Sequence, residues 1–375
     1  MELAERKLDK IRSAWNDYFL RYAFCQNEIN YSEEVATNYF GDVVAYLDDT
    51  FPIISKKPFL DDGKEHLGNA MALLQAIYVQ QDLVDELMII FALPKSNNDF
   101  KKENRDLRNH LIGHPISRDK KGKLISTVFF RYDNPSSEIS YVFYEWSNRY
   151  QGDMRAISID RIIETHRQFL HRNLDIILKK IRTILYKQRK ELKRVLSSMK
   201  DTRRFGSLVA DTFNYFEEIA NLDHLYKKDR LLYYYAKRKE HPRYAHAVRL
   251  FRSDLKQCLT ETIADIKSYG KPVILPPPYD PAGHPKIEII YVDHDTFKGK
   301  RRKYKKDLGY EISKLHEKGH PLGLEYLLRR FGDRPLVGDE LRFMKDNLQD
   351  DMEYYAGYQY VKKLLKRVSS RMFYA

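Results

Sequence analysis

The segment HLGNAMALLQAIYVQQDLVDELMIIFALP, residues 66–94, carries an apolar stripe from which the rest of the fold can be worked out. Its stripe follows the spacing of one helix face and consists of Leu74, Ile77, Tyr78, Val84, Leu87, Met88 and Phe91. Pro94 cannot continue a helix, because proline lacks a backbone N–H and its ring clashes with the preceding turn. The segment therefore predicts a long, buried helix over about 66–91.

Further helices are predicted on both sides of this one. The same spacing recurs at about 3–23 and 33–47 before it, and at about 100–113 and 158–199 after it. Between the last two, residues 124–131 and 139–146 are rich in β-branched and aromatic residues and flank a turn-forming stretch at 133–137. We therefore expect a mainly α first domain over residues 1–200, a helical bundle with a β-hairpin inserted at about 123–147.

Residues 201–375 are expected to form a second, mostly helical domain with minor β structure. Helices are predicted at about 207–238, 243–268 and 339–369, and a strand is predicted at 286–292 after a proline-rich connector at 271–281. No catalytic signature is evident in this half, and its role stays open.

Composition limits the class of protein. Apolar residues make up 43% of the 375, which is enough for two cores. No run approaches eighteen uncharged apolar residues, so we expect no membrane span, and the N-terminal residues show no apolar signal segment. The only cysteines, Cys25 and Cys258, are far apart in sequence. They exclude a disulfide framework and favour the reducing cytoplasm.

The formal charge of +13 is concentrated in two runs. Residues 179–204 contain eleven Lys or Arg against two acids, and residues 298–306 contain seven basic residues in nine. Basic clusters attract polyanions and bind phosphate without reading sequence, although such runs also occur on ordinary solvated surfaces. The predicted RNA-binding residues are Arg189, Lys190, Lys193, Arg194, Lys300, Arg301, Arg302, Lys303, Lys305 and Lys306.

A compact motif, Arg105-Asp106-Leu107-Arg108-Asn109-His110-Leu111-Ile112-Gly113-His114-Pro115, lies at the end of the helix predicted at 100–113. In it, five residues separate Arg108 from His114, the first of them Asn109. Four residues separate Arg105 from His110, the first of them Asp106. The motif resembles the signature of the HEPN superfamily, an arginine next to a polar residue and a histidine four to six residues further on. We prefer Arg108, Asn109 and His114 as the catalytic set, because Asn after Arg is typical of the active members.

The resemblance covers about residues 1–190. It implies a helical bundle that cleaves RNA without a cofactor or a metal, and a homodimer in which two motifs line one cleft. It also implies a cytoplasmic defence or toxin effector that an antitoxin or regulatory protein would restrain. The alternative is a non-catalytic HEPN scaffold that binds RNA or a protein partner.

The chemistry explains why these residue types matter. RNA can be cleaved by attack of its own 2′-hydroxyl, so the protein must move protons and stabilise charge on phosphate. Histidine, with an ordinary pKa near 6.5, moves protons, and arginine presents a planar fork to phosphate oxygens. On a regular helix Arg108 and His114 would lie about 120° apart, so they could meet only if the helix unwinds near Gly113.

Secondary candidates surround this set. Arg105 and His110 form the alternative pair, and Gln81 with adjacent Asp82 places a polar group on the apolar stripe, either to line a cleft or to satisfy the local backbone. His110 and His114 could share a metal, but no third ligand is evident. His166 is expected to be a core histidine. The segment 316–320 matches HExxH, but Gly319 and Pro321 predict a turn there instead of a zinc-peptidase helix.

Overall fold

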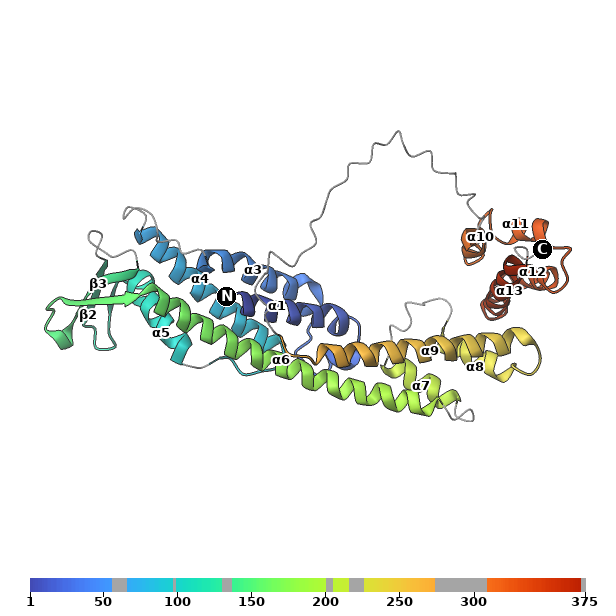
Figure 1. The fold of residues 1–375 in the computed structure, drawn as a ribbon, viewed down its shortest axis with the longest axis horizontal. Helices are drawn as coiled ribbons and strands as arrows, with labels where there is room; N and C mark the ends of the chain where they lie inside the picture. The colour runs from blue at the N-terminus through green and yellow to red at the C-terminus, as the bar shows by residue number, and fades with distance from the viewer. Residues whose placement is uncertain are drawn as a thin grey trace, which may run out of the picture. The chain divides into compact units, whose positions relative to one another are not determined.

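The computed structural model describes residues 1–55, 66–96, 99–129, 137–199, 205–215, 226–273 and 309–371 (Figure 1). These residues are mainly helical and include one small antiparallel sheet, which confirms the predicted fold class at that level. The chain divides into two compact units. Unit 1 comprises Met1–Lys190 and the described part of Asp265–Pro276, and unit 2 comprises the remaining described residues.

The helices of unit 1 surround α4. Their bounds are α1 Glu2–Ala14, α2 Ala23–Gln26, α3 Phe40–Ser55, α4 His66–Ile90, α5 Asp99–Arg108 and the first part of α6 Ile159–Ser198, with π-helical turns at Trp15–Phe19, Val35–Tyr39 and Asn109–Gly113. The apolar stripe predicted on α4 is buried except for Tyr78, which is half-buried. Each fully buried Leu or Ile in it stabilises the fold by roughly 1.5–3 kcal/mol, so α4 is the centre of the unit's core.

A four-stranded antiparallel sheet lies at one end of this bundle, beside α5 and the start of α6 (Figure 1). Its strands are β1 Ile116–Arg118, β2 Leu124–Phe129, β3 Glu138–Glu145 and β4 Asp153–Ser158, in the order β1-β2-β3-β4. The predicted hairpin is present as β2 and β3, but the sheet continues into β1 and β4, which the sequence reading missed. One face carries Ile139, Tyr141 and Phe143 into the core formed with α4. The opposite face leaves Val128 and Met154 53% and 69% exposed.

Unit 2 is helical throughout its described part. It contains the end of α6, α7 Phe205–Tyr215, α8 Lys228–Ala236, most of α9 Pro242–Tyr269, α10 Gly309–Lys314, α11 Leu324–Phe331, α12 Val337–Asp346 and α13 Asp351–Arg371. Leu327, Leu341 and Tyr354 belong to its core. A buried ion pair joins Arg243 on α9 to Glu340 on α12 at 2.7 Å.

Two of the predicted helices in this half are wrong as continuous elements. The helix predicted over 207–238 is interrupted, because Lys227 has extended backbone angles (φ −85°, ψ 141°) just before α8. The helix predicted over 339–369 is two helices, because Asp350 caps a new one by accepting hydrogen bonds from the backbone N–H groups of Met352 and Glu353 at 2.8 and 3.2 Å. The strand predicted at 286–292 lies outside the described residues.

A buried polar network links three helices of unit 1. His166 on α6 donates from Nε2 to Oε1 of Gln80 on α4 at 2.7 Å, and Gln80 donates from Nε2 to Oγ1 of Thr50 on α3 at 2.9 Å. All three side chains are buried. His166 is therefore the core histidine that its place on the stripe predicted. Burial lowers its pKa from 6.5 to about 3, since the charged imidazolium cannot be solvated there.

This histidine should make stability depend on pH. The unfolded chain takes up a proton on His166 as the pH falls below 6.5, whereas the folded chain keeps the ring neutral down to about pH 3. Acid therefore favours the unfolded state across that window, and the loss between pH 7 and pH 5.5 is roughly 1 kcal/mol for this group. Urea unfolding of the wild type should show that extra loss relative to His166→Gln, which cannot titrate but can still donate to Gln80. Equal losses in both proteins would contradict the assignment.

Candidate functional site

The motif begins at the end of α5 and continues through a π-helical turn. Residues Asn109–Gly113 form this turn, and it closes with a hydrogen bond from the backbone N–H of His114 to the carbonyl oxygen of Asn109 at 2.7 Å. A π-turn contains one residue more than an α-turn and is frequent at functional sites. The regular spacing that would place Arg108 and His114 about 120° apart therefore does not hold here.

Arg108 folds back over the turn. A Cβ atom added to Gly113 would lie 2.6 Å from Nη1 of Arg108, so only glycine leaves room for the guanidinium at this place. The guanidinium also donates to Oε1 of Gln75 from Nε and Nη2 at 3.2 and 3.1 Å, and its Cζ lies 4.4 Å from the ring centre of Tyr78. All these partners are uncharged. Within the described ranges Arg108 forms no ion pair, so its charge is not neutralised.

The other two members of the preferred set flank this guanidinium in sequence. Oδ1 of Asn109 accepts a hydrogen bond from Nη1 of Arg108 at 3.2 Å. His114 follows Gly113 and is exposed. No hydrogen bond joins its imidazole to Arg108 among the residues that the structure describes. The turn thus brings Arg108 and Asn109 together and leaves the imidazole open to solvent.

The alternative pair is placed differently. Arg105 is bound to the carboxylate of Asp82 and donates from Nε to Oε1 of Gln81 at 3.1 Å, so its charge is already paired. His110 is half-buried, with its ring 5.4 Å from that of Phe143. These contacts make Arg105 and His110 part of the packing between α4, α5 and β3. The geometry therefore favours Arg108 over Arg105 as the arginine available to a ligand.

Gln81 satisfies a backbone group, which is one of the two roles that its position suggested. It is fully buried, accepts from Arg105, and donates from Nε2 to the backbone carbonyl of Lys101 at 3.4 Å. Asp82, one residue further along α4, is exposed and holds the other end of the same guanidinium. The two residues anchor α5 on α4.

Candidate metal ligands do not assemble in the described parts of the chain. No three His, Cys, Asp or Glu side chains there are arranged to hold a metal ion. The HExxH match at 316–320 is a turn beyond the end of α10, as predicted from Gly319. Within it Lys318 pairs with Asp351 at 2.6 Å, and Nδ1 of His320 accepts from the backbone N–H of Leu322 at 3.1 Å.

Of the predicted RNA-binding residues, the two that unit 1 contains, Arg189 and Lys190, lie far from the motif along α6. Asn104 on α5 donates to the carbonyl of Ile162, which places the motif near the start of α6. Arg189 lies 27 residues later, about 40 Å along that helix. Arg189 and Lys190 belong to unit 1 and Lys193 and Arg194 to unit 2, where Arg194 is paired with Glu191 and Asp211. The residues from Lys300 to Lys306 lie outside the described part of the chain.

A basic hairpin next to the motif was missed by the sequence reading. It joins β1 to β2 and carries Arg118, Lys120, Lys121 and Lys123 against the single acid Asp119. Oδ1 of Asp119 accepts from the backbone N–H groups of Lys121 and Lys123 at 2.8 Å, which orders the turn. Its first basic residue, Arg118, is four positions beyond His114, within about 14 Å of extended chain. The lysines at 120–123 are the sequence feature that could have predicted it, but this cluster is shorter than the basic runs at 179–204 and 298–306.

An exposed aromatic side chain lies beside this basic hairpin. Trp146, just after β3, is 58% exposed, and Nζ of Lys123 lies 3.4 Å from its ring centre. Exposed aromatic rings among cations are the features on which unpaired bases stack. This side of the sheet therefore suits single-stranded nucleic acid better than the distant residues of α6 do.

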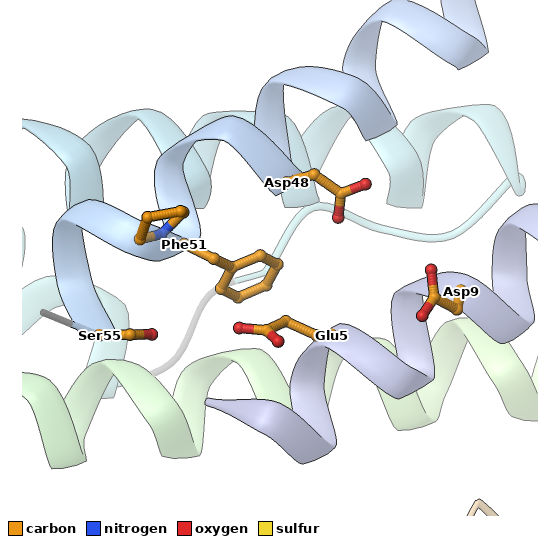
Figure 2. Close-up of a pocket in the computed structure, with 6 residues that line it drawn as sticks. Glu5, Asp9, Asp48, Phe51 and Ser55 are labelled. Atoms are coloured by element: carbon orange, nitrogen blue, oxygen red, sulfur yellow. The ribbon is translucent and has the colours of Figure 1, made fainter. Parts of the chain in front are cut away.

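A separate cavity of about 530 Å³ lies between α1 and α3 (Figure 2). Figure 2 shows Glu5 and Asp9 on α1 facing Asp48 and Phe51 on α3. Arg12 pairs with both Asp9 and Asp48, whereas Glu5, the third carboxylate of the lining, has no such pair with Arg12 in the described residues. Its acidic lining would repel a polyanion.

Comparison with known proteins adds no family to this geometry. No protein-family model, no curated protein and no solved structure matches the chain. In the described part, none of the helices combines the length and the apolar character that crossing a membrane requires.

The different settings of the two arginines lead to a stability prediction. Arg105→Ala should lower the free energy of unfolding by about 1–3 kcal/mol, because Oε1 of Gln81 would be left buried without a donor. Arg108→Ala should cost less than about 1 kcal/mol, because the hydrogen bonds it loses are to Gln75, which is exposed, and to Asn109, which is not fully buried, together with the contact to Tyr78. Urea unfolding of both variants measures the difference. A loss as large for Arg108→Ala as for Arg105→Ala would show that Arg108 is structural.

Proposed function

We propose that this protein is an endoribonuclease of the HEPN type, which cleaves RNA by attack of the 2′-hydroxyl without needing a metal. One observation carries the proposal: neutral groups hold Arg108 over Gly113, one residue before an exposed histidine, and no described carboxylate pairs with it. An arginine that is only positioned and not neutralised is suited to bind an anion.

Each residue of the set has a place in this reaction. The 2′-oxygen attacks the adjacent phosphorus, the bond from phosphorus to the 5′-oxygen breaks, and the products are a 2′,3′-cyclic phosphate and a 5′-hydroxyl. A proton must leave the 2′-hydroxyl and another must reach the 5′-oxygen, and His114 would transfer one of them. Arg108 would stabilise the negative charge that builds on the phosphate oxygens, and Asn109 would orient Arg108 through the hydrogen bond to Nη1.

The reaction needs a second proton-transfer group. Each chain's motif contributes one exposed imidazole, so a homodimer with two motifs facing one cleft would supply both the acid and the base. Dimerisation is part of the proposal because the resemblance to HEPN proteins implies it. The same resemblance suggests a defence or toxin role restrained by an antitoxin or regulatory protein.

The basic hairpin with Trp146 would hold the substrate. Lys120 and Lys121 are exposed, and Trp146 offers an exposed ring beside Lys123. Cations track the RNA backbone and rings stack on unpaired bases, so this surface fits single-stranded RNA.

Cleavage by motif variants tests the proposal. Purified full-length protein should cut a labelled single-stranded RNA in the presence of EDTA. His114→Ala should slow this cleavage by about 10²–10⁴-fold through loss of proton transfer, and Arg108→Ala by about 10²–10³-fold through loss of charge stabilisation. The measurement is the single-turnover rate, together with identification of the 2′,3′-cyclic phosphate end.

His320→Ala is a matched control, because His320 lies in a turn of unit 2 away from the motif in sequence. It should cut RNA at the wild-type rate. Cleavage that survives both motif changes would remove the site assignment. RNA binding without any cleavage by the wild type would favour the alternative of a non-catalytic scaffold.

Gly113→Ala offers a test that leaves every functional group in place. The new methyl group would lie where Nη1 of Arg108 sits, so the flexible guanidinium must move while the fold stays intact. The single-turnover rate should fall at least tenfold with an unchanged unfolding temperature. Gly68→Ala on α4 is the control, because a Cβ there meets nothing within 4 Å. Wild-type cleavage by Gly113→Ala would contradict a role for this placement of Arg108.

A further inference from the structure

We propose that unit 1 also contains a binding pocket for a small nucleoside phosphate, in which Arg182 and Arg189 hold the phosphate and Tyr186 contacts the base. The pocket lies between α6 and the final turn of α9 and has a volume of about 220 Å³. Its lining includes these three residues together with Lys267 and Tyr269 and no carboxylate.

The two arginines share one face of α6. They are seven residues apart, two helical turns or about 10 Å along the axis, with Tyr186 between them. The Nε atoms of both are shielded from solvent and have no hydrogen-bond acceptor. In the described residues neither guanidinium forms an ion pair. Both side chains are half-buried and line the cavity, so their guanidinium groups place positive charge there that no carboxylate of the lining balances.

Other cations add to the positive potential at this place. Nζ of Lys10 lies 4.7 Å from the ring centre of Tyr269, and Lys267 lines the cavity. Desolvation first, and then repulsion from Arg182, lower the pKa of Lys10. Two carboxylates lie close to this part of the chain without lining the cavity. Glu28 is paired with Lys187 at 2.8 Å, and Asp265 acts on Tyr18, whose pKa is raised by burial and then by this carboxylate.

The chemistry of the lining selects the ligand class. Guanidinium groups match phosphate oxygens in geometry and charge, and two of them can hold one phosphate group from both sides. The ring of Tyr186 is 69% exposed beside them and offers a face on which a base can stack. The small volume fits one phosphate group and part of a nucleoside better than it fits the continuous backbone of a nucleic-acid strand.

This pocket is independent of the proposed ribonuclease site. The motif lies near Ile162 at the start of α6, whereas Arg182 and Arg189 are 20 and 27 residues further on, about 30 and 40 Å along the helix. Failure of the cleavage experiments would not contradict the proposed pocket. Failure of AMP to bind would not contradict the proposed ribonuclease site.

Calorimetric titration of the full-length protein with AMP, inorganic phosphate and adenosine, at constant ionic strength, tests the inference. We expect AMP to bind, phosphate to bind more weakly and to compete with AMP, and adenosine to show no detectable binding. Arg182→Gln and Arg189→Gln should each weaken the binding of AMP at least tenfold. Tyr186→Ala should weaken the binding of AMP and leave the binding of phosphate unchanged.

Arg172→Gln is the matched control, because Arg172 is exposed on the same helix outside the pocket. It should bind AMP within twofold of the wild type. The pocket variants should unfold at the wild-type temperature, since neither arginine makes a side-chain hydrogen bond to another residue that the structure describes. The proposal is overturned if the wild type does not bind AMP at millimolar concentration or if both arginine variants bind it normally. It is also overturned if an RNA strand without a terminal phosphate group binds these arginines more tightly than AMP does.

Discussion

A buried hydrogen bond between His166 and Gln80 sets the position of α4, and the rest of unit 1 depends on that position. It connects α6 to α4, and the amide of the same glutamine continues to Thr50 on α3. Apolar packing alone would tolerate small sliding of one helix along another. Directional bonds between buried groups do not, because any shift would leave a donor or acceptor unpaired in a medium that cannot replace it.

The same helix presents a second set of groups to α5. Gln75, Tyr78 and Gln81 recur at three-residue intervals along α4, and they receive Arg108 and Arg105, which are also three residues apart. Both guanidinium groups lie 4.4 Å from the ring centre of Tyr78. Because the contact is repeated once per turn, the register between the two helices determines which arginine meets Asp82 and which remains unpaired. The position of the motif follows from the packing of α4.

Sequence patterns predicted those parts of the structure that repeat. The stripe from Leu74 to Phe91 predicted α4, and β-branched residues predicted β2 and β3, because burial of one face requires a period. The short β1 contains three residues and has no period to detect. The π-turn at 109–113 leaves no trace in composition, so the sequence allowed both Arg105 and Arg108 as the functional arginine. Only the carboxylate of Asp82, brought close by the fold, distinguishes them.

Arginines without an ionic partner connect the two proposals physically. Arg105 and Arg243 each form an ion pair with a carboxylate, so their charges are balanced within the fold. Arg108 is held by neutral groups, and Arg182 and Arg189 share a cavity that has no acid in its lining. Two like charges at one cavity repel each other, and in the described residues no carboxylate lines this cavity to balance them. An anion that arrives from solution supplies the missing compensation, and its binding energy then depends on positions that the helices have already set.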